Sequence, residues 1–266
     1  MIFSHHIKLP LGKKVFFASD FHLGMRKDDS HRENRIIRWL NSIQEDAHAI
    51  FLLGDIFDFW FEYKQVIPKG FVRLQGKLAE ITDSGIKTFY FTGNHDMWMK
   101  SYFTEELGIP IHYEPKQFVI NGKQFLVGHG DGLGPGDGFY KFLKKFFQNK
   151  WCQWAFARVH PNLGVGLAKY LAERSRQNHI KNEIPFLGKD EYLFSFCKET
   201  ELKQHHDFYV FGHRHLPLEM SINEQSTYYN VGEWIKEFTF GEFDGVSFTV
   251  KSFEKQKVES YPLYKD

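Results

Sequence analysis

Five short apolar runs, each followed at once by side chains that can bind a metal ion, limit what this chain can fold into. They span residues 15–19, 50–53, 88–92, 124–127 and 208–211. Short runs rich in β-branched and aromatic residues are typical of buried strands. Because the carboxyl ends of the strands of an α/β sheet lie side by side, we expect the five turns that follow to converge on one crevice.

The five turns offer carboxylate, amide and imidazole groups and no thiolate. They read Asp20-Phe21-His22, Gly54-Asp55, Gly93-Asn94-His95-Asp96, Gly128-His129-Gly130-Asp131 and Gly212-His213-Arg214-His215. The candidate metal ligands are Asp20, His22, Asp55, Asn94, His129, His213 and His215. This donor set suits manganese, iron, zinc or cobalt rather than calcium or a copper–thiolate centre. Seven ligands exceed what one tetrahedral ion uses, so we expect two divalent ions that share a carboxylate, and Asp55 is the natural bridge.

The segments between the apolar runs have helical spacing. Ile36, Leu40 and Ile43 share one helix face, and so do Leu74 and Leu78. Strands that alternate with helices predict a layered α/β fold, and further strands are expected near 227–231, 238–243 and 246–253. The stretch of sequence between the motifs of His129 and His213 is longer than those between the other successive motifs, and the excess is about the length of an inserted segment. We therefore predict a core of residues 1–137 and 189–266, interrupted by a helical cap insertion at 138–188.

The first part of this insertion, residues 139–158, is rich in aromatic and basic residues and lacks acidic ones. A helix with an aromatic face and a cationic flank suits a membrane interface or an amphiphilic anionic ligand. The alternative is that its aromatic face packs on the core while its lysines stay in water. The first interpretation predicts that Lys144 and Lys145 face anionic lipid.

Charge and composition exclude several other classes of function. Lys and Arg number 34 against 33 Asp and Glu, a net charge of +1, so no overall attraction to nucleic acid is expected. Two cysteines are too few for a disulfide framework or a cysteine-based zinc site. No apolar stretch is long enough for a membrane span, and the first ten residues do not resemble a signal peptide. We expect a cytoplasmic protein with no obligate protein partner.

The five motifs, in this order, resemble those of the calcineurin-like metallophosphoesterase superfamily. The resemblance implies a two-sheet α/β sandwich, flanked by helices, around a dinuclear centre. One metal would take Asp20, His22, Asp55 and His215, and the other Asp55, Asn94, His129 and His213. His95 would meet the phosphate and help to protonate the leaving group, with Asp96 or another carboxylate orienting it. Manganese is the expected metal.

Nearly the whole chain is similar to one branch of that superfamily, the UDP-2,3-diacylglucosamine hydrolases of lipid A synthesis. The resemblance covers residues 128–140, the Trp-rich helix, 172–181 and 229–234. It implies attack on the α-phosphorus of a UDP-linked acylated glucosamine, giving UMP and 2,3-diacylglucosamine 1-phosphate. The reaction would take place at the cytosolic face of a Gram-negative inner membrane, with the protein bound peripherally.

The same branch suggests which residues contact the substrate. The expected positions are Asn94, His95, Asp137, Tyr140, Ser175, Arg176, Asn178, Lys181 and His213, with His179 and Asn182 as alternatives to Asn178 and Lys181. The chain departs from the branch at His95, where proteobacterial members commonly have Arg. Two other functions remain open: hydrolysis of a soluble diester, nucleotide or phosphoprotein, and a non-catalytic scaffold.

Overall fold

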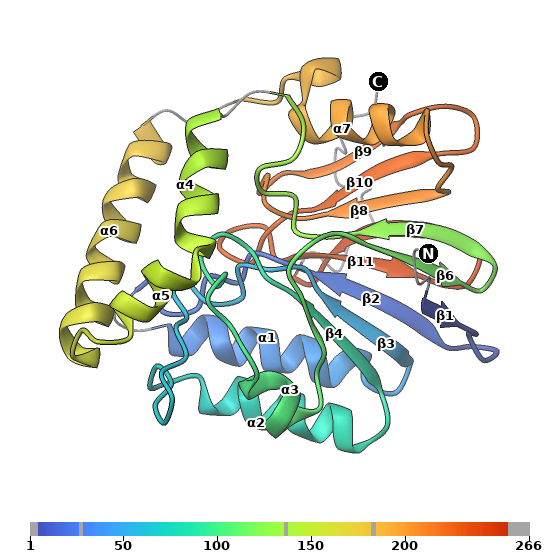
Figure 1. Cartoon of the computed structure of the whole chain (residues 1–266). Coiled ribbons are helices and arrows are strands. Elements are labelled where there is room, and N and C mark those ends of the chain that lie inside the picture. The colour runs from blue at the N-terminus through green and yellow to red at the C-terminus, as the bar shows by residue number, and fades with distance from the viewer. Residues whose placement is uncertain (1–4, 27–28, 136–137, 182–184, 255–266) are drawn as a thin grey trace.

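Two six-stranded sheets packed face to face form the core of the protein (Figure 1). A computed structural model describes residues 5–26, 29–135, 138–181 and 185–254, without the side chains of residues 139 and 175–181. The two-sheet α/β architecture implied by the motif resemblance is confirmed.

The first sheet carries the three N-terminal strands that were expected from the sequence. Its order is β12 (Phe248–Ser252), β11 (Thr239–Phe243), β2 (Lys14–Ala18), β3 (Ala47–Leu52), β4 (Lys87–Phe91) and β5 (Ile111–His112). Strands β2 to β5 run parallel, and β11 pairs antiparallel with both β2 and β12. Helices α1 (Ser30–Ile43) and α2 (Val72–Asp83) cover the outer face, and α3 (Tyr102–Leu107) precedes β5.

The second sheet contains the other two strands that lead into metal-binding motifs. Its order is β1 (His5–Ile7), β6 (Lys116–Ile120), β7 (Lys123–Val127), β8 (Phe208–Phe211), β10 (Thr227–Val231) and β9 (Pro217–Ser221). Strands β7, β8 and β10 run parallel, so the carboxyl ends of β7 and β8 lie next to each other. A single turn of 3₁₀ helix, η1 (Gly188–Asp190), leads into α7 (Tyr192–Glu201), which covers the outer face of this sheet.

Phenylalanine fills much of the space between the sheets, which accounts for part of the 29 Phe in the chain. Phe17 and Phe51 of the first sheet stack at 4.8 Å between ring centroids, and Phe51 meets Phe118 of the second sheet edge-on at 4.9 Å. Offset and edge-on ring pairs add to the stabilisation that burial alone provides. The two sheets are therefore joined by a tightly packed aromatic layer.

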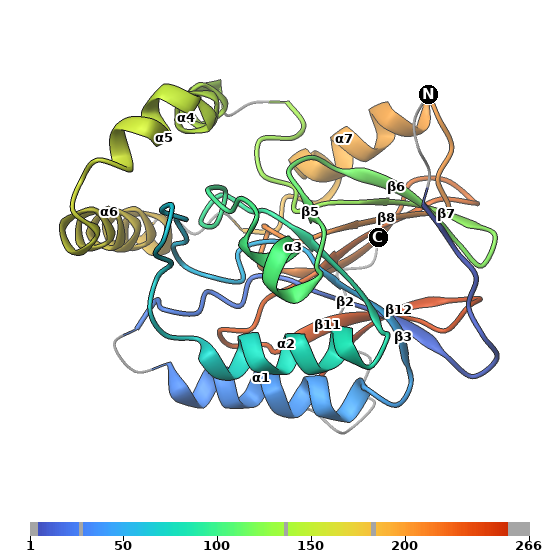
Figure 2. The ribbon, with the colours of Figure 1, turned by 60° about the horizontal axis from the view of Figure 1, so that its bottom comes forward.

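Three helices lie at the end of the sandwich toward which β2 and β7 point (Figures 1 and 2). They are α4 (Gly138–Gln148), α5 (Lys150–Phe156) and α6 (Pro161–Lys181). The predicted insertion is thus helical in its described residues, while its role as a cap stays a prediction. Among the described residues, no helix has both the length and the apolar character needed to cross a bilayer.

Candidate metal centre

The five motif turns meet at one end of the sandwich, but they come from two sheets rather than one. Strands β2, β3 and β4 of the first sheet lead into the turns with Asp20, Asp55 and Asn94. Strands β7 and β8 of the second sheet lead into those with His129 and His213. The expected convergence therefore depends on how the sheets face each other as well as on parallel strands within each sheet.

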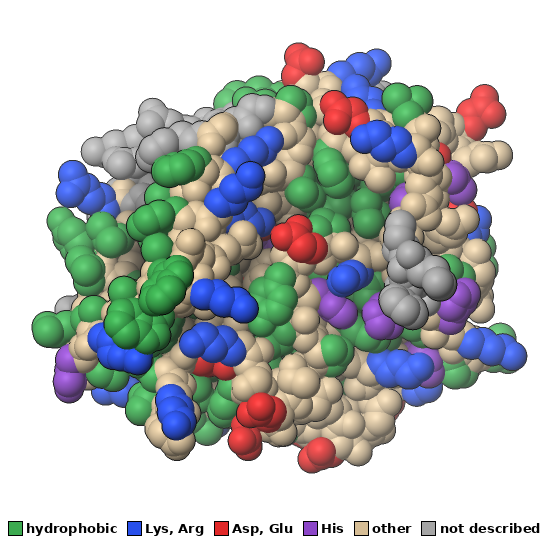
Figure 3. Space-filling view, in the orientation of Figure 1, with side chains coloured by type: hydrophobic (Ala, Val, Ile, Leu, Met, Phe, Trp, Pro, Cys, Tyr) green, Lys and Arg blue, Asp and Glu red, His purple; other side chains and the backbone are tan. Residues whose placement is uncertain are grey.

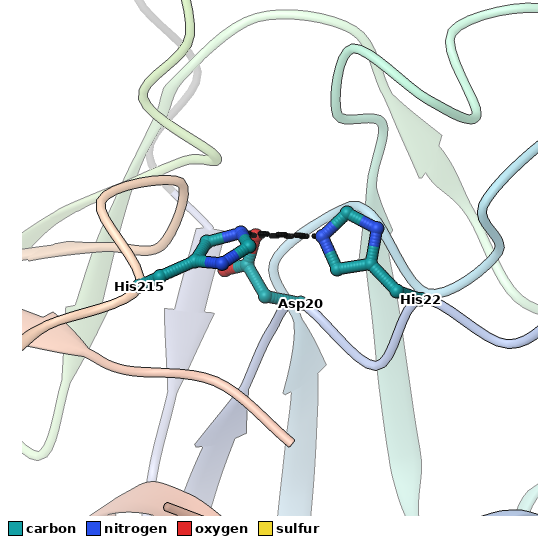
Figure 4. A group of neighbouring side chains, drawn as sticks. All are labelled: Asp20, His22 and His215. Carbon is teal, nitrogen blue, oxygen red and sulfur yellow. Dashed lines mark hydrogen bonds and ion pairs between the residues drawn. The ribbon is translucent and has the colours of Figure 1, made fainter. Parts of the chain in front are cut away.

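Asp20, His22 and His215 form the first group of candidate ligands (Figure 4). The Nε2 atom of His215 lies 3.1 Å from Asp20 Oδ1, and that of His22 lies 3.7 Å from the same oxygen. The two Nε2 atoms are 3.2 Å apart and point toward one another. Three donor atoms from two sheets are thus aimed at one small volume.

Asp55 connects the first group to a second one. Its Oδ1 accepts a hydrogen bond from the backbone N–H of His95 at 2.8 Å. Its Oδ2 lies 3.8 Å from His22 Nε2 and 3.5 Å from His129 Nε2. One oxygen therefore fixes the carboxylate while the other faces both groups, as a bridging ligand requires.

His129, His213 and Asn94 complete the second group around Asp55. His129 donates from Nδ1 to the carbonyl oxygen of Leu53 at 2.6 Å, which leaves Nε2 directed at the site. Asn94 Oδ1 lies 3.4 Å from that Nε2. Ligand atoms of Asp55, His129 and His213 lie within 4.8 Å of one another. All seven sequence-predicted ligands thus lie together.

The donor set fits divalent metal ions. Asp20 Oδ1 is buried and has no hydrogen-bond partner among the described residues, although two imidazoles approach it. A buried carboxylate oxygen without a hydrogen bond is costly unless a cation compensates it. Imidazole nitrogens directed at shared carboxylates, without thiolates, match the preference of manganese, iron, zinc or cobalt.

The backbone holds these side chains in an uncommon conformation. Five of the candidate ligands have left-handed backbone angles, with φ between 45° and 68°: Asp20, His22, Asp55, His213 and His215. Residues with side chains avoid this region unless the surrounding structure enforces it. Close approach of the turns is part of that enforcement, because a Cβ on Gly54 would lie 2.7 Å from His129 Nδ1.

The carboxylates control the protonation of the imidazoles. Burial acts to lower the pKa of His22, but its hydrogen bonds with Asp20 and Asp58 raise the pKa to about 10. Burial likewise acts to lower the pKa of His129, but the charge of Asp55 outweighs it and raises the pKa to about 10. In contrast, burial and repulsion by His129 lower the pKa of His213 to about 4.

Metal loading is therefore expected to release protons. At pH 7.5 the metal-free protein carries protons on His22 and His129, and a metal ligand must be a neutral imidazole, so about two protons should leave per chain. Calorimetric titration with Mn²⁺ in buffers of different ionisation enthalpy measures this number. Binding enthalpies that do not depend on the buffer would contradict the protonation states assigned to these two residues.

His95 lies against the first group and is oriented by Asp58, a residue that the sequence analysis missed. Its Nδ1 lies 2.9 Å from the carbonyl oxygen of Asp58, and its ring meets the His22 ring edge-on. The Asp58 carboxylate is 2% exposed and lies 3.3 Å from His22 Nδ1. The sequence feature that could have indicated Asp58 is its position three residues after the candidate ligand Asp55. A carboxylate behind a candidate ligand orients the imidazole and raises its basicity.

Asp96 has a different environment from the one expected. Its carboxylate accepts hydrogen bonds from the backbone N–H groups of Gly93 at 2.7 Å and Ile56 at 2.9 Å, and from the hydroxyl of Tyr90 at 2.5 Å. Burial and the nearby Asp55 raise the pKa of Asp96 to about 6. The expectation was that Asp96 or another carboxylate orients His95, and the contacts favour the second option: Asp96 shapes the turn, while Asp58 lies against His95, with its Oδ1 3.7 Å from His95 Nδ1.

The residues expected to contact substrate fall into three sets. Asn94, His95 and His213 are at the candidate metal centre. Tyr140 lies on α4 and donates from its hydroxyl to Asp131 Oδ2 at 2.7 Å. Asp137 lies outside the described residues, as does the alternative Asn182. The side chains of the rest, all on α6, are also outside the description: Ser175, Arg176, Asn178, His179 and Lys181.

Two basic residues have partners that the sequence did not indicate. Lys144 was expected to face lipid, but its Nζ lies 2.8 Å from Asp131 Oδ2, which is buried. Arg214, which had no assigned role, pairs with the buried carboxylate of Glu191. Both cations are held by buried acids near the candidate centre, and such pairing, unlike surface charge, is not visible in the sequence.

The helices α4 to α6 combine packed and exposed aromatic residues, so only part of their aromatic surface packs on the core, and contact with a membrane or lipid stays a prediction. Phe156 packs on Trp98 at 4.8 Å between ring centroids. Other large apolar side chains are more than half exposed. They are Phe142, Phe146, Trp151, Trp154, Leu163, Leu167, Tyr170 and Leu171. Figure 3 shows hydrophobic side chains with Lys and Arg among them on the side where Figure 1 places these helices.

Comparison with known proteins agrees with this geometry. The family profile described as calcineurin-like phosphoesterase matches residues 13–217. A protein of Porphyromonas gingivalis named UDP-2,3-diacylglucosamine hydrolase is 36% identical over 256 residues, which cover 91% of this chain and 98% of the relative. A protein of the same name from Histophilus somni is 25% identical, and the match covers 84% of this chain and 92% of the relative. Another from Ectopseudomonas mendocina is 26% identical, and the match covers 90% of this chain and 98% of the relative.

Proposed function

The chain belongs to the calcineurin-like phosphoesterase family and is a metal-dependent hydrolase, and from that premise we propose that it cleaves UDP-2,3-diacylglucosamine. The products would be UMP and 2,3-diacylglucosamine 1-phosphate. The observation that carries the proposal is the 36% identity along 98% of a relative with that name, since the match includes the α4 to α6 segment. Superfamily chemistry alone would not specify a substrate.

The metal assignment follows the two groups of ligands. Asp20, His22, Asp55 and His215 would hold one ion, and a second would be held by Asp55, Asn94, His129 and His213. When bound, a pair of divalent ions activates water and stabilises the charge on a phosphoryl group during in-line displacement. Manganese is the ion we propose, with iron, zinc or cobalt as alternatives. Backbone hydrogen bonds join the turns that carry these ligands, such as those from Asp20 N to Gly54 O and from Gly212 N to His129 O.

In the proposed reaction, a bond forms between water oxygen and the α-phosphorus while the bond from that phosphorus to the bridging oxygen breaks. The bridging oxygen leaves with the lipid monophosphate. His95 would meet this leaving oxygen through Nε2, since its Nδ1 donates to the carbonyl oxygen of Asp58. A donor fixed at that position favours departure because it neutralises charge that develops only as the bond breaks.

The α4 to α6 segment, within residues 138–188, would act as the lipid-binding cap. Its exposed aromatic and aliphatic side chains suit acyl chains and the membrane boundary, and Lys145 and Lys150 are exposed on the same segment. We place the protein at the cytosolic face of the inner membrane of a Gram-negative cell. Asp137, Ser175, Arg176, Asn178 and Lys181 stay proposed substrate contacts.

A single labelling experiment tests both the substrate and the position of cleavage. Purified, Mn²⁺-loaded protein is given UDP-2,3-diacylglucosamine in H₂¹⁸O, and the products are analysed by mass spectrometry. We expect UMP that carries ¹⁸O and unlabelled lipid monophosphate. Label in the lipid phosphate would move the attack to the β-phosphorus. Turnover of bis-p-nitrophenyl phosphate without turnover of the lipid would refute the substrate and favour a soluble diester.

Reversing the charge of Lys145 and Lys150 together is expected to weaken binding to vesicles that contain anionic lipid. Each exposed lysine near an anionic surface contributes about 1 kcal/mol, so the double variant should bind roughly 30-fold less tightly. Co-sedimentation with phosphatidylglycerol vesicles at two salt concentrations measures the effect. Lys203→Glu, which changes an exposed lysine after α7, is the matched control. Equal binding by all three proteins would exclude this face as the membrane contact.

A further inference from the structure

The last motif turn is joined to the segment that follows α6 by an ion pair whose carboxylate is buried. Arg214 donates from Nε to Glu191 Oε2 at 2.9 Å and from Nη2 to Oε1 at 3.1 Å. The same Nη2 donates to the carbonyl oxygen of Pro185 at 2.6 Å. Glu191 is 1% exposed. A two-point contact between guanidinium and carboxylate fixes orientation as well as distance.

The turn that Arg214 anchors is one that needs support. Arg214 lies between His213 and His215, whose φ angles are 68° and 57°. Two left-handed residues with side chains, one on each side of Arg214, persist only where surrounding contacts hold them. The backbone N–H of His213 donates to Asp20 Oδ2 at 2.9 Å, which holds the turn from the side of the first sheet. The Arg214–Glu191 pair holds it from the opposite side.

The other end of the α4 to α6 segment is attached in the same manner. Asp131, two residues after His129, is 5% exposed and receives the ammonium of Lys144 at 2.8 Å and the hydroxyl of Tyr140 at 2.7 Å. Both donors lie on α4. Each junction of the segment is thus tied by a buried acid to a turn that carries candidate ligands.

We propose that Arg214 is a positioning residue that couples the docking of residues 185–191 to the geometry of His213 and His215. If this segment moves away, the contact between Arg214 and Glu191 breaks and the turn loses one of the contacts that hold it. Conversely, metal ions that fix the two histidines favour the docked segment, because coupling between two sites acts equally in both directions. The inference rests on the metal assignment of the proposed function and not on the lipid substrate.

The first measurement is the affinity for Mn²⁺ of the full-length protein, determined by electron paramagnetic resonance of the free ion. Loss of a partner behind a metal ligand costs roughly 10–100-fold in affinity, and we expect that range for Arg214→Ala and Glu191→Gln. Arg214→Lys keeps the charge without the two-point contact, so its affinity for Mn²⁺ should lie between that of these variants and that of wild type. Lys203→Ala, at an exposed site after α7, is the matched control.

The second measurement reads the same coupling from the opposite end. Lys189 is exposed within the docked segment, so trypsin cleavage after it reports how firmly the segment is held. Mn²⁺ should slow this cleavage in wild type and in Lys203→Ala, and it should have little effect in Arg214→Ala or Glu191→Gln. A purely structural ion pair would predict lower thermal stability without a change in either readout.

Two outcomes would overturn the proposal. One is wild-type Mn²⁺ affinity in folded Glu191→Gln and Arg214→Lys, which remain informative if Arg214→Ala does not fold. The other is cleavage after Lys189 that Mn²⁺ slows equally in all variants. Neither readout uses the lipid, so failure of the labelling experiment with UDP-2,3-diacylglucosamine would leave this result intact.

Discussion

Asp55→Ala is expected to remove the dinuclear centre and, with it, measurable hydrolysis. Asp55 Oδ2 faces His22 Nε2 at 3.8 Å and His129 Nε2 at 3.5 Å, so its loss deprives both groups of a ligand. It also leaves two protonated imidazoles without one of the carboxylates that compensate them in the metal-free protein. The loss of activity should exceed the roughly 10–100-fold that removal of an outer partner costs.

Metal content by mass spectrometry and turnover of a phosphodiester test this expectation together. Circular dichroism establishes that the variant is folded, and Asp83→Ala, at an exposed position near the end of α2, serves as the matched control. Two bound ions with near-normal turnover in Asp55→Ala would mean that Asp55 is not the bridge, and the assignment of both groups would be wrong.

His95→Ala is expected to keep the metal ions but slow the chemical step by ~10²–10⁴, the usual contribution of an acid–base group. Nδ1 carries the proton donated to the carbonyl oxygen of Asp58, so Nε2 donates only when the ring is protonated. Burial lowers the pKa of His95, and the protonated fraction falls as pH rises. The advantage of wild type over His95→Ala should therefore shrink toward alkaline pH.

Single-turnover rates across pH, with metal content measured in parallel, test this role. His95→Arg is the informative comparison, because a guanidinium supplies a permanent charge and a donor. It should retain more activity than His95→Ala and show less dependence on pH. If His95→Ala loses metal in proportion to activity, His95 acts as a ligand instead, which its grouping with His22 and Asp55 makes a definite alternative.

The central strands were predictable because burial on both faces gives continuous apolar runs, as in β2, β3, β4, β7 and β8. The edges were not. Strand β5 has two residues, and β1 is mostly histidine, so neither has a hydrophobic period to detect. Strand β6 did leave a signal that was overlooked. Asn121-Gly122, with φ angles of 50° and 84°, forms the two-residue turn that joins β6 to β7.

The candidate ligands were predictable because each follows a predicted strand, and the carboxyl ends of neighbouring parallel strands lie side by side within each sheet. The acidic residues that support the ligands and their turns were not predictable. Asp58, Asp131 and Glu191 act through burial, which depends on segments that are distant in sequence. The left-handed backbone angles of Asp20, His22 and Asp55 were equally hidden, because Asp and His adopt this conformation more often than most residues with side chains but still only uncommonly. The pairing of Lys144 with Asp131 likewise required the placement of α4.

The division of the ligands between the two sheets has a consequence for the whole fold. Each proposed ion would draw ligands from both layers, since His215 joins a group from the first sheet and Asp55 joins a group from the second. Metal would then act as a cross-link between layers that are otherwise joined by aromatic packing. Removal of the ions by a chelator would weaken the interface between the two sheets. Metal supply would then govern the stability of the folded protein as well as its catalytic activity.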